Sequence, residues 1–187
     1  MYAPPWFYRS DDDWNALVEH LKRTPCPHCK TVGTLIRHGN LYGFDDSRPQ
    51  RQTLRARRIF CSNRNARPGC GRTLSVWRAD TIRRLCLSAA MLWRFLLGAA
   101  AVGIVAAMRD STVQLSYRTY QRLWRRFDLH QSNIRTALHG CCPTPQLPAP
   151  PSRRPQAAQT LAHLQAAFPE SDSPIAAFQQ TLHTFFV

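Results

Sequence analysis

Hydrophobic and polar residues alternate with helical spacing at the start of the chain. A helix is predicted to begin at Ser10, whose hydroxyl can cap the first turn, and to end before Pro25. The three aspartates at residues 11–13 point in different directions around such a helix, so we interpret them as first-turn charges and not as a metal site. The expected apolar face consists of Trp14, Leu17, Val18 and Leu21.

The pattern between residues 26 and 77 changes to short β-like runs separated by turn-forming residues. Strands are predicted over residues 34–38, 52–60 and 72–77. Arginines alternate onto both faces of the middle run, so neither face is expected to form a clean core. A bound metal is therefore expected to supply much of the stability of this segment.

Helical spacing returns after residue 81. Helices are predicted over residues 87–97, 102–108, 116–127 and 131–138, with boundaries at Gly98, Asp110 and Gly140. Prolines then crowd residues 143–155, which favours an extended linker. Two short amphipathic helices are predicted beyond it, over residues 156–168 and 174–186. This tail has few basic residues, and we expect it to contact another protein.

A long apolar stretch over residues 85–108 raises the question of a membrane span. Arg94 lies near its middle, where an arginine costs about 2.5 to 3.5 kcal/mol on insertion scales. Buried helices and no membrane contact are therefore expected. The first residues lack a basic segment followed by an apolar run, so we also expect a cytoplasmic, reducing location.

The charge of the chain is strongly positive and unevenly distributed. The formal net charge is +14, and Lys22 and Lys30 are the only lysines. Residues 48–84 contain eleven arginines and one acid, Asp80, which gives a local net charge of +10. Arginine binds phosphate through two parallel hydrogen bonds and stacks on bases, so this bias favours a nucleic-acid partner. A solvated basic face and adsorption to acidic lipid are the alternatives.

Four of the seven cysteines have the spacing of a zinc ribbon. Cys26 and Cys29 are separated by two residues, which lets both sulfurs reach one tetrahedral ion. Cys61 and Cys70 are separated by eight, which is wider than usual, but Pro68 and Gly69 can form the tight turn while the residues before them loop out. We predict one structural zinc ion held by Cys26, Cys29, Cys61 and Cys70.

Other uses of these cysteines remain open. A redox dithiol, an iron centre, and His28 or His38 in place of one cysteine are the alternatives. Cys86 is expected in a core, and Cys141 and Cys142 are expected to be exposed at a helix end.

Residues 116–127 carry a second basic segment. An apolar stripe at helical spacing is predicted on one side, and most of the arginines fall on the other. A short helix and a turn precede this segment, an order typical of a helix-turn-helix, whose second helix enters the major groove. The expected stripe is Tyr117, Tyr120, Leu123, Trp124 and Phe127. The expected DNA contacts here are Arg118, Gln121, Arg122 and Arg125. An ordinary surface helix is the alternative.

Three segments carry a resemblance to a known family. CPHCKTVGTLIRHG, RRIFCSNRNARPGCGRTLSV and SYRTYQRLWRRF resemble the zinc-ribbon and helix-turn-helix head of bacterial insertion-sequence transposases and their accessory proteins. The resemblance covers about residues 26–138 and is most specific at residues 26–29 and 70–73. It implies zinc at the four cysteines and binding to DNA, with the ends of a mobile element as a candidate target.

The chain departs from that family after residue 138. Such transposases continue into an RNase H-like domain with three separated carboxylates, whereas only Glu170 and Asp172 are acidic here. Strand transfer by this chain alone is therefore not expected, nor is any other enzymatic activity, because four thiolates would complete the zinc coordination. An accessory or regulatory protein is the family role that remains.

The expected fold is therefore α+β. It consists of an N-terminal helix (1–24), a β zinc ribbon (25–80), a helix-turn-helix-like all-α domain (81–140), a proline-rich linker (141–155) and a helical tail (156–187). The ribbon is expected to present six arginines to the phosphates of double-stranded DNA: Arg55, Arg57, Arg58, Arg64, Arg67 and Arg72. The alternative function is an adaptor that docks onto a separate recombinase or nuclease, through tail residues that include Leu161, Phe168, Phe178 and Phe186.

Overall fold

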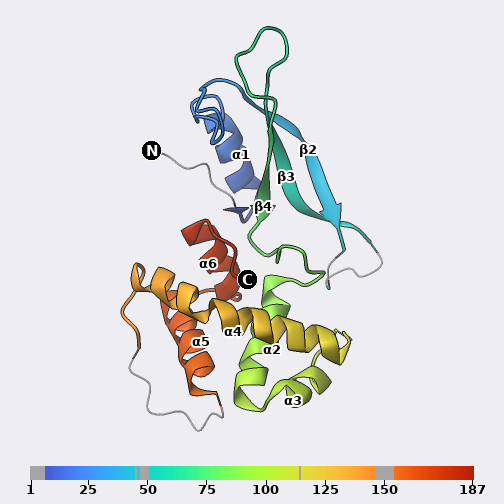
Figure 1. Cartoon of the computed structure of the whole chain (residues 1–187), viewed down its shortest axis with the longest axis vertical. Helices are drawn as coiled ribbons and strands as arrows, with labels where there is room; N and C mark the ends of the chain where they lie inside the picture. Colours follow the sequence, from blue (N-terminus) through green and yellow to red (C-terminus); the bar gives the residue numbers. More distant parts are fainter. Residues whose placement is uncertain (1–6, 45, 47–50, 114, 146–153) are drawn as a thin grey trace. The chain divides into compact units, whose positions relative to one another are not determined.

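The computed structural model describes residues 7–44, 46, 51–113, 115–145 and 154–187 (Figure 1). The chain is α+β, as predicted, and combines a four-stranded sheet with six helices. It divides into two compact units, residues 1–81 and 82–187, which are described separately below.

The first unit contains the sheet. Its strands are β1 (Phe7–Tyr8), β2 (Leu35–Gly43), β3 (Thr53–Cys61) and β4 (Thr73–Arg78), in the spatial order β1-β4-β3-β2. β1 runs parallel to β4, and the other pairs are antiparallel. The three predicted strands are confirmed, although β2 continues five residues beyond its predicted end. β1 was not predicted, because two residues carry no periodicity.

Helix α1 (Asp11–His20) begins where the sequence predicts. The Ser10 hydroxyl accepts a hydrogen bond from the Asp13 amide at 3.1 Å, and the Asp13 carboxylate accepts one from the Ser10 amide at 3.2 Å. This reciprocal capping box satisfies two donors at the helix start. The aspartates at residues 11–13 form the acidic first turn, as expected.

One face of the sheet packs on α1 and forms the core of this unit. Trp14 and Leu17 from the helix lie against the sheet residues Ile59, Leu74 and Val76, all of them buried. The prediction that neither face of the middle strand forms a core is therefore wrong. This face tolerates an arginine, Arg57, because aromatic rings cover its guanidinium, as described below.

The second unit is helical. Its helices are α2 (Ala89–Ala101), α3 (Ile104–Arg109), α4 (Tyr117–His139), α5 (Pro155–Ala167) and α6 (Pro174–Leu182). α4 is one helix of 23 residues where two were predicted. Gly98 does not end a helix: it lies inside α2, and a Cβ there would be 3.1 Å from the Cβ of Ala107 in α3. Its small size lets the two helices pack closely. Asp110 and Gly140 are helix boundaries, as predicted.

The tail helices share one core with α2 and α4. Leu161, Phe178 and Phe186 are each no more than 2% exposed, and the ring of Phe186 stacks on Phe127 of α4 at a centroid distance of 6.0 Å. These three side chains therefore lie inside the unit. The adaptor hypothesis required them to be exposed to a partner protein, and they are not. Most of the predicted proline-rich linker, residues 146–153, lies outside the described residues.

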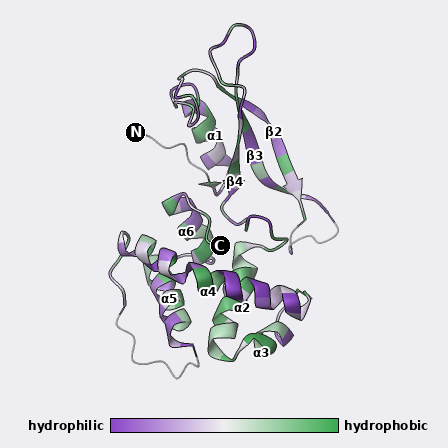
Figure 2. Ribbon diagram, viewed as in Figure 1, coloured by the Kyte–Doolittle hydropathy of each residue, from purple (hydrophilic) through white to green (hydrophobic). Residues whose placement is uncertain are grey.

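Hydrophobic residues are distributed along the helices as amphipathic faces (Figure 2). α4 carries hydrophilic and hydrophobic residues side by side, and its apolar members Tyr120, Leu123 and Phe127 are buried. Among the described segments, no helix is both long and apolar enough to cross a membrane.

Candidate metal centre

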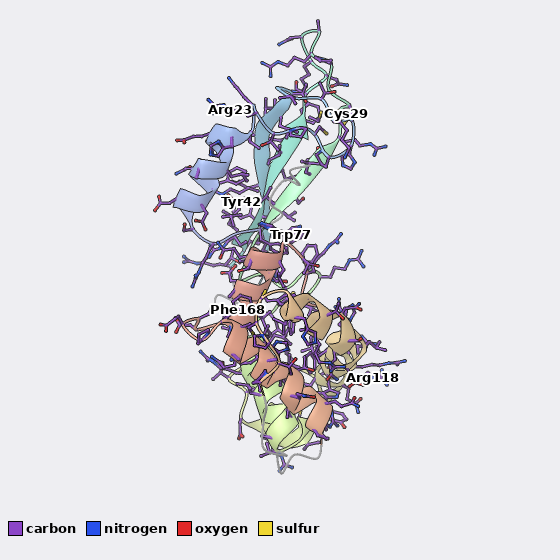
Figure 3. All side chains as sticks on the ribbon, turned by 90° about the vertical axis from the view of Figure 1, so that its left-hand side faces the viewer. Arg23, Cys29, Tyr42, Trp77, Arg118 and Phe168 are labelled. Atoms are coloured by element: carbon purple, nitrogen blue, oxygen red, sulfur yellow. The ribbon has the colours of Figure 1, made fainter. Side chains whose placement is uncertain are left out.

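Four cysteine sulfurs meet at one end of the sheet. Cys26, Cys29, Cys61 and Cys70 have sulfur atoms that all lie within 4.8 Å of one another. The Cys26–Cys70 and Cys29–Cys61 sulfur separations are 3.8 and 3.6 Å. Figure 3 shows Cys29 at the end of the sheet opposite to Tyr42 and Trp77. The predicted set of four is therefore brought together.

The first pair lies on a tight turn, which we call knuckle 1 (residues 26–31). The Lys30 amide donates to the Cys26 carbonyl at 2.8 Å, and the Cys26 amide donates to the Thr31 carbonyl at 3.0 Å. Lys30 has a φ of 63°, in the left-handed region. The chain thus reverses direction directly after the second cysteine, which turns both sulfurs to the same side.

The second pair repeats this hydrogen-bond pattern in knuckle 2 (residues 61–72). The Gly71 amide donates to the Cys61 carbonyl at 2.9 Å, and the Cys61 amide donates to the Arg72 carbonyl at 2.9 Å. Gly71 follows the second cysteine, as Lys30 does, and its φ is 72°. The two knuckles are therefore equivalent at their bases despite their different lengths.

The extra length of knuckle 2 is confined to an inserted loop, residues 63–68. The Gly69 amide donates to the Ser62 carbonyl at 3.2 Å and closes the base of this loop. Ser62 and Gly69 thus occupy the two positions that Pro27 and His28 occupy in knuckle 1. A Cβ at Gly69 would lie 2.1 Å from the Ser62 carbonyl oxygen, so the close approach requires glycine.

Neighbouring groups shift the pKa values of the cysteine thiols in different directions. The Thr34 hydroxyl lies 3.2 Å from the Cys61 sulfur, and the Cys70 amide donates to that sulfur at 3.3 Å. Hydrogen bonding from the Thr31 side chain lowers the pKa of the Cys29 thiol to about 6, whereas burial raises the pKa of Cys26 to about 11. Such donors stabilise thiolates, the form in which cysteine ligates metals.

The arrangement can hold one metal ion. Four sulfurs around an ion at about 2.3 Å in a tetrahedron lie about 3.8 Å apart, which matches the two separations above.

No protein family model, curated protein or solved structure matches the chain. The assignment of the centre therefore depends on its own geometry. Within the described residues, the group of possible ligands contains only cysteines, and neither His28 nor His38 belongs to it. Arg72 instead lies 3.3 Å from the Nδ1 atom of His28.

Two of the arginines predicted to meet phosphate are turned inward. Arg55 is 8% exposed, and its guanidinium donates to the Phe44 carbonyl. Arg57 forms an ion pair with Asp11, and its guanidinium lies over the rings of Tyr8 and Trp14, at 5.7 and 5.1 Å from their centroids. The expectation that both side chains extend freely toward phosphate is therefore wrong, because Arg55 is buried and Arg57 is half-buried against the two aromatic rings.

The other four ribbon arginines that were predicted to meet phosphate are exposed: Arg58, Arg64, Arg67 and Arg72. Arg58 extends from β3, and Arg64 and Arg67 belong to the inserted loop of knuckle 2. The structure therefore separates four candidates for phosphate contact from two structural arginines. Alternation along β3 places Arg55 and Arg57 on one face and Arg58 on the other, but it does not tell which face is covered.

Helix α4 places its predicted contact residues outward. Arg118, Gln121, Arg122 and Arg125 are exposed, while the predicted apolar stripe is buried except for Tyr117, which is 46% exposed. The short helix α3 precedes α4 in the chain, in the predicted order. The Tyr120 hydroxyl fixes the segment between them by donating to the Val113 carbonyl at 2.6 Å.

The predictions for the three cysteines outside the centre are only partly correct. Cys86 is exposed, so its predicted place in a core is wrong; it precedes α2 and lies outside the apolar face of that helix. Cys141 is exposed just after α4, as predicted, and Cys142 is half-buried there. Sequence analysis missed the roles of Thr34 and Ser62 at the centre, and no motif marks either residue.

Proposed function

We propose that this chain is a zinc-stabilised DNA-binding protein, acting as an accessory or regulatory factor of a bacterial mobile element. The observation that carries the proposal is the distribution of exposed arginine. Four exposed arginines, Arg58, Arg64, Arg67 and Arg72, lie in the unit that holds the cysteine centre, and three more, Arg118, Arg122 and Arg125, are exposed on α4.

Zinc is the metal that suits the centre best. Four thiolates in a tetrahedral set are typical of structural zinc, and they leave no coordination position for a catalytic water. The role proposed for the metal is therefore to hold the two knuckles together, and no enzymatic activity is assigned. A reducing cytoplasm would keep the thiols available for the metal.

DNA is favoured as the partner because the exposed arginines are separate from the carboxylates of the protein. Three of the four acids of α1 lie at the start of that helix, where Asp11 forms an ion pair with Arg57, and Asp80 pairs with Arg78. The exposed arginines of the inserted loop and of α4 have no carboxylate partner among the described residues. Such groups are available to phosphates, whose neutralisation releases counterions.

The mobile-element setting depends on the resemblance to transposase heads. It draws on the first knuckle, on the Cys-Gly-Arg-Thr sequence at residues 70–73, and on the basic segment at the start of α4. It names a biological context and not a target sequence.

Duplex binding by a paired set of variants tests the proposal. Replacing Arg122 and Arg125 together by alanine should weaken binding to a duplex at least tenfold, measured by fluorescence anisotropy. Arg94→Ala/Arg109→Ala is the matched control, because it also removes two exposed arginines, one from α2 and one from α3 of the same unit. Equal loss in both variants would reduce the effect to net charge and contradict a role for α4.

A protein adaptor is the second candidate, and a different surface favours it. Leu97, Val102 and Val105 are 43 to 63% exposed at the junction of α2 and α3. Exposed apolar residues that are close together can mark a protein contact. The variant Val102→Glu would abolish binding to a protein partner and leave DNA binding intact if the adaptor function is correct.

A further inference from the structure

The sheet of the first unit has an open face opposite α1. Successive residues of a strand point to opposite faces, so Arg58 and Phe60 lie on the face opposite to the buried Ile59 and Cys61. Arg58 is exposed and Phe60 is half-buried. This face, unlike the other, therefore carries groups that solvent can reach.

The neighbours of these two residues are mostly small. Arg58 stands opposite Gly39 in β2 and Ser75 in β4, and Phe60 stands between Ile36 in β2 and Thr73 in β4. The glycine and the serine leave the Arg58 guanidinium to project above the sheet, and Ile36 is the one large side chain among these four partners. None of the residues on this face that pair with Arg58 or Phe60 is acidic.

Planar groups are stacked around Phe60. The His38 ring lies 5.3 Å from the Phe60 ring at an angle of 32°, and the Arg64 guanidinium lies over the Phe60 ring at 5.4 Å. His38 and Arg64 are both exposed. Two exposed planar groups, an imidazole and a guanidinium, therefore lie against the Phe60 ring, where a further planar group can reach them.

We infer that this face binds unpaired bases of DNA, which continue the stack on His38 or Arg64 while Arg58 meets the backbone. Every base has a π-face, but base pairing and stacking inside a duplex cover it, so a stacking surface selects single-stranded segments. Positive charge, and the lack of carboxylates among the described strand residues of this face, suit a polyanion. The inference rests on the proposed DNA-binding function and adds a strand preference to it.

The test removes the planar surfaces and keeps the charge. The double variant His38→Ala/Arg64→Lys should bind a 20-nucleotide single strand about tenfold more weakly and a duplex within twofold of wild type, because one base stack is worth roughly this factor. The matched control is His20→Ala/Arg23→Lys. It changes an exposed histidine on α1 and an exposed arginine just after that helix, neither of which belongs to the proposed DNA contacts. It should bind both DNAs like wild type.

Photocrosslinking locates the contact. A single strand carrying 5-iodouracil should crosslink to a peptide that contains His38 or Phe60. Equal weakening of single-strand and duplex binding in the His38/Arg64 variant, or the same loss in the control, would overturn the inference. A tenfold preference of the wild-type protein for the matching RNA would overturn the choice of DNA.

The outcomes separate this inference from the proposed function. Duplex binding that depends on Arg122 and Arg125, without any effect of the His38/Arg64 variant on single strands, would leave the proposed function standing and refute the stacking surface. Binding to single strands alone would refute the duplex function and support the stacking surface. A wild-type protein that binds neither form of DNA would refute both.

Discussion

The amide of Gly69 donates a hydrogen bond to the carbonyl oxygen of Ser62 at 3.2 Å, and this contact joins the two ends of the inserted loop. On either side of it, knuckle 2 has the same hydrogen bonds as knuckle 1. The sulfur positions of Cys61 and Cys70 are thus set at the base of the loop. The loop itself, which contains Arg64 and Arg67, is free to serve another purpose.

Deleting residues 63–68 should therefore preserve the metal centre. The shortened sequence, Cys-Ser-Gly-Cys, has the spacing of knuckle 1, so one zinc ion per chain is expected by mass spectrometry under native conditions. Loss of two arginines should also reduce the salt dependence of duplex binding by about 1.8 in the log–log slope, since each phosphate contact contributes about 0.9.

Gly69→Ala provides the opposite test of the same contact. Its Cβ would lie 2.1 Å from a backbone oxygen, so the base of the loop must open. Metal affinity should fall at least tenfold, measured by competition with a chromophoric chelator. Gly140→Ala is the control, because a Cβ there makes an ordinary contact of 3.5 Å. If the deletion loses zinc while Gly69→Ala keeps it, the loop is part of the centre and our account of knuckle 2 is wrong.

Two adjacent arginines should have opposite roles. Arg57→Ala removes the ion pair with Asp11 and the stacking on Tyr8 and Trp14, so urea denaturation should show a loss of about 1 to 3 kcal/mol in the free energy of unfolding. Arg58→Ala should leave this free energy within about 0.5 kcal/mol, because exposed substitutions cost little. DNA binding should weaken in the Arg58 variant. Equal stability of the two variants would contradict the placement of Arg57 in the core.

The difference between these arginines shows where sequence analysis stops. The Ser10 cap of α1 was predicted because the hydroxyl and the amides it caps are close in the chain, and the cysteine set was predicted because its spacing is local within the first knuckle. Burial of Arg57 depends on rings from β1 and α1, which are distant in sequence. Alternation along β3 fixes the face on which a side chain lies, but not what covers that face.

Tertiary contacts also explain the helical corrections. No glycine or proline interrupts residues 117–139, so the two predicted helices join into α4, whose continuation is held by the buried Ile134 and Leu138. The apolar faces of α5 and α6 were recognised, but periodicity indicates only that a face is covered. In the structure α2 and α4 cover it, where a partner protein was expected.

Zinc binding should weaken as the pH falls. Burial raises the pKa of Cys26 to about 11, so its thiol keeps a proton throughout the range from pH 7 to 9 and must release it to bind zinc. The logarithm of the affinity should therefore rise by at least about one per pH unit over this range. Because the pKa of Cys29 is lowered to about 6, the proton of that thiol competes with zinc only below that value, where it should add to the slope.

Chelator competition at a series of pH values measures this dependence. Cys86→Ser is the control, since Cys86 lies outside the cysteine centre, and it should follow the wild-type curve. An affinity that does not change between pH 7 and 9 would show that no thiol proton is displaced, and the four-thiolate assignment would then be wrong.

The most direct test of a metal-supported DNA-binding surface is the salt dependence of duplex binding by zinc-loaded and metal-stripped protein. Four ribbon arginines and three on α4 predict a log–log slope of about −6 for the loaded protein if each meets a phosphate. Stripping the metal should release the two knuckles and make the slope shallower, toward about −3. This value is the contribution expected from the three arginines of α4. Binding that depends on neither salt nor zinc would contradict the account.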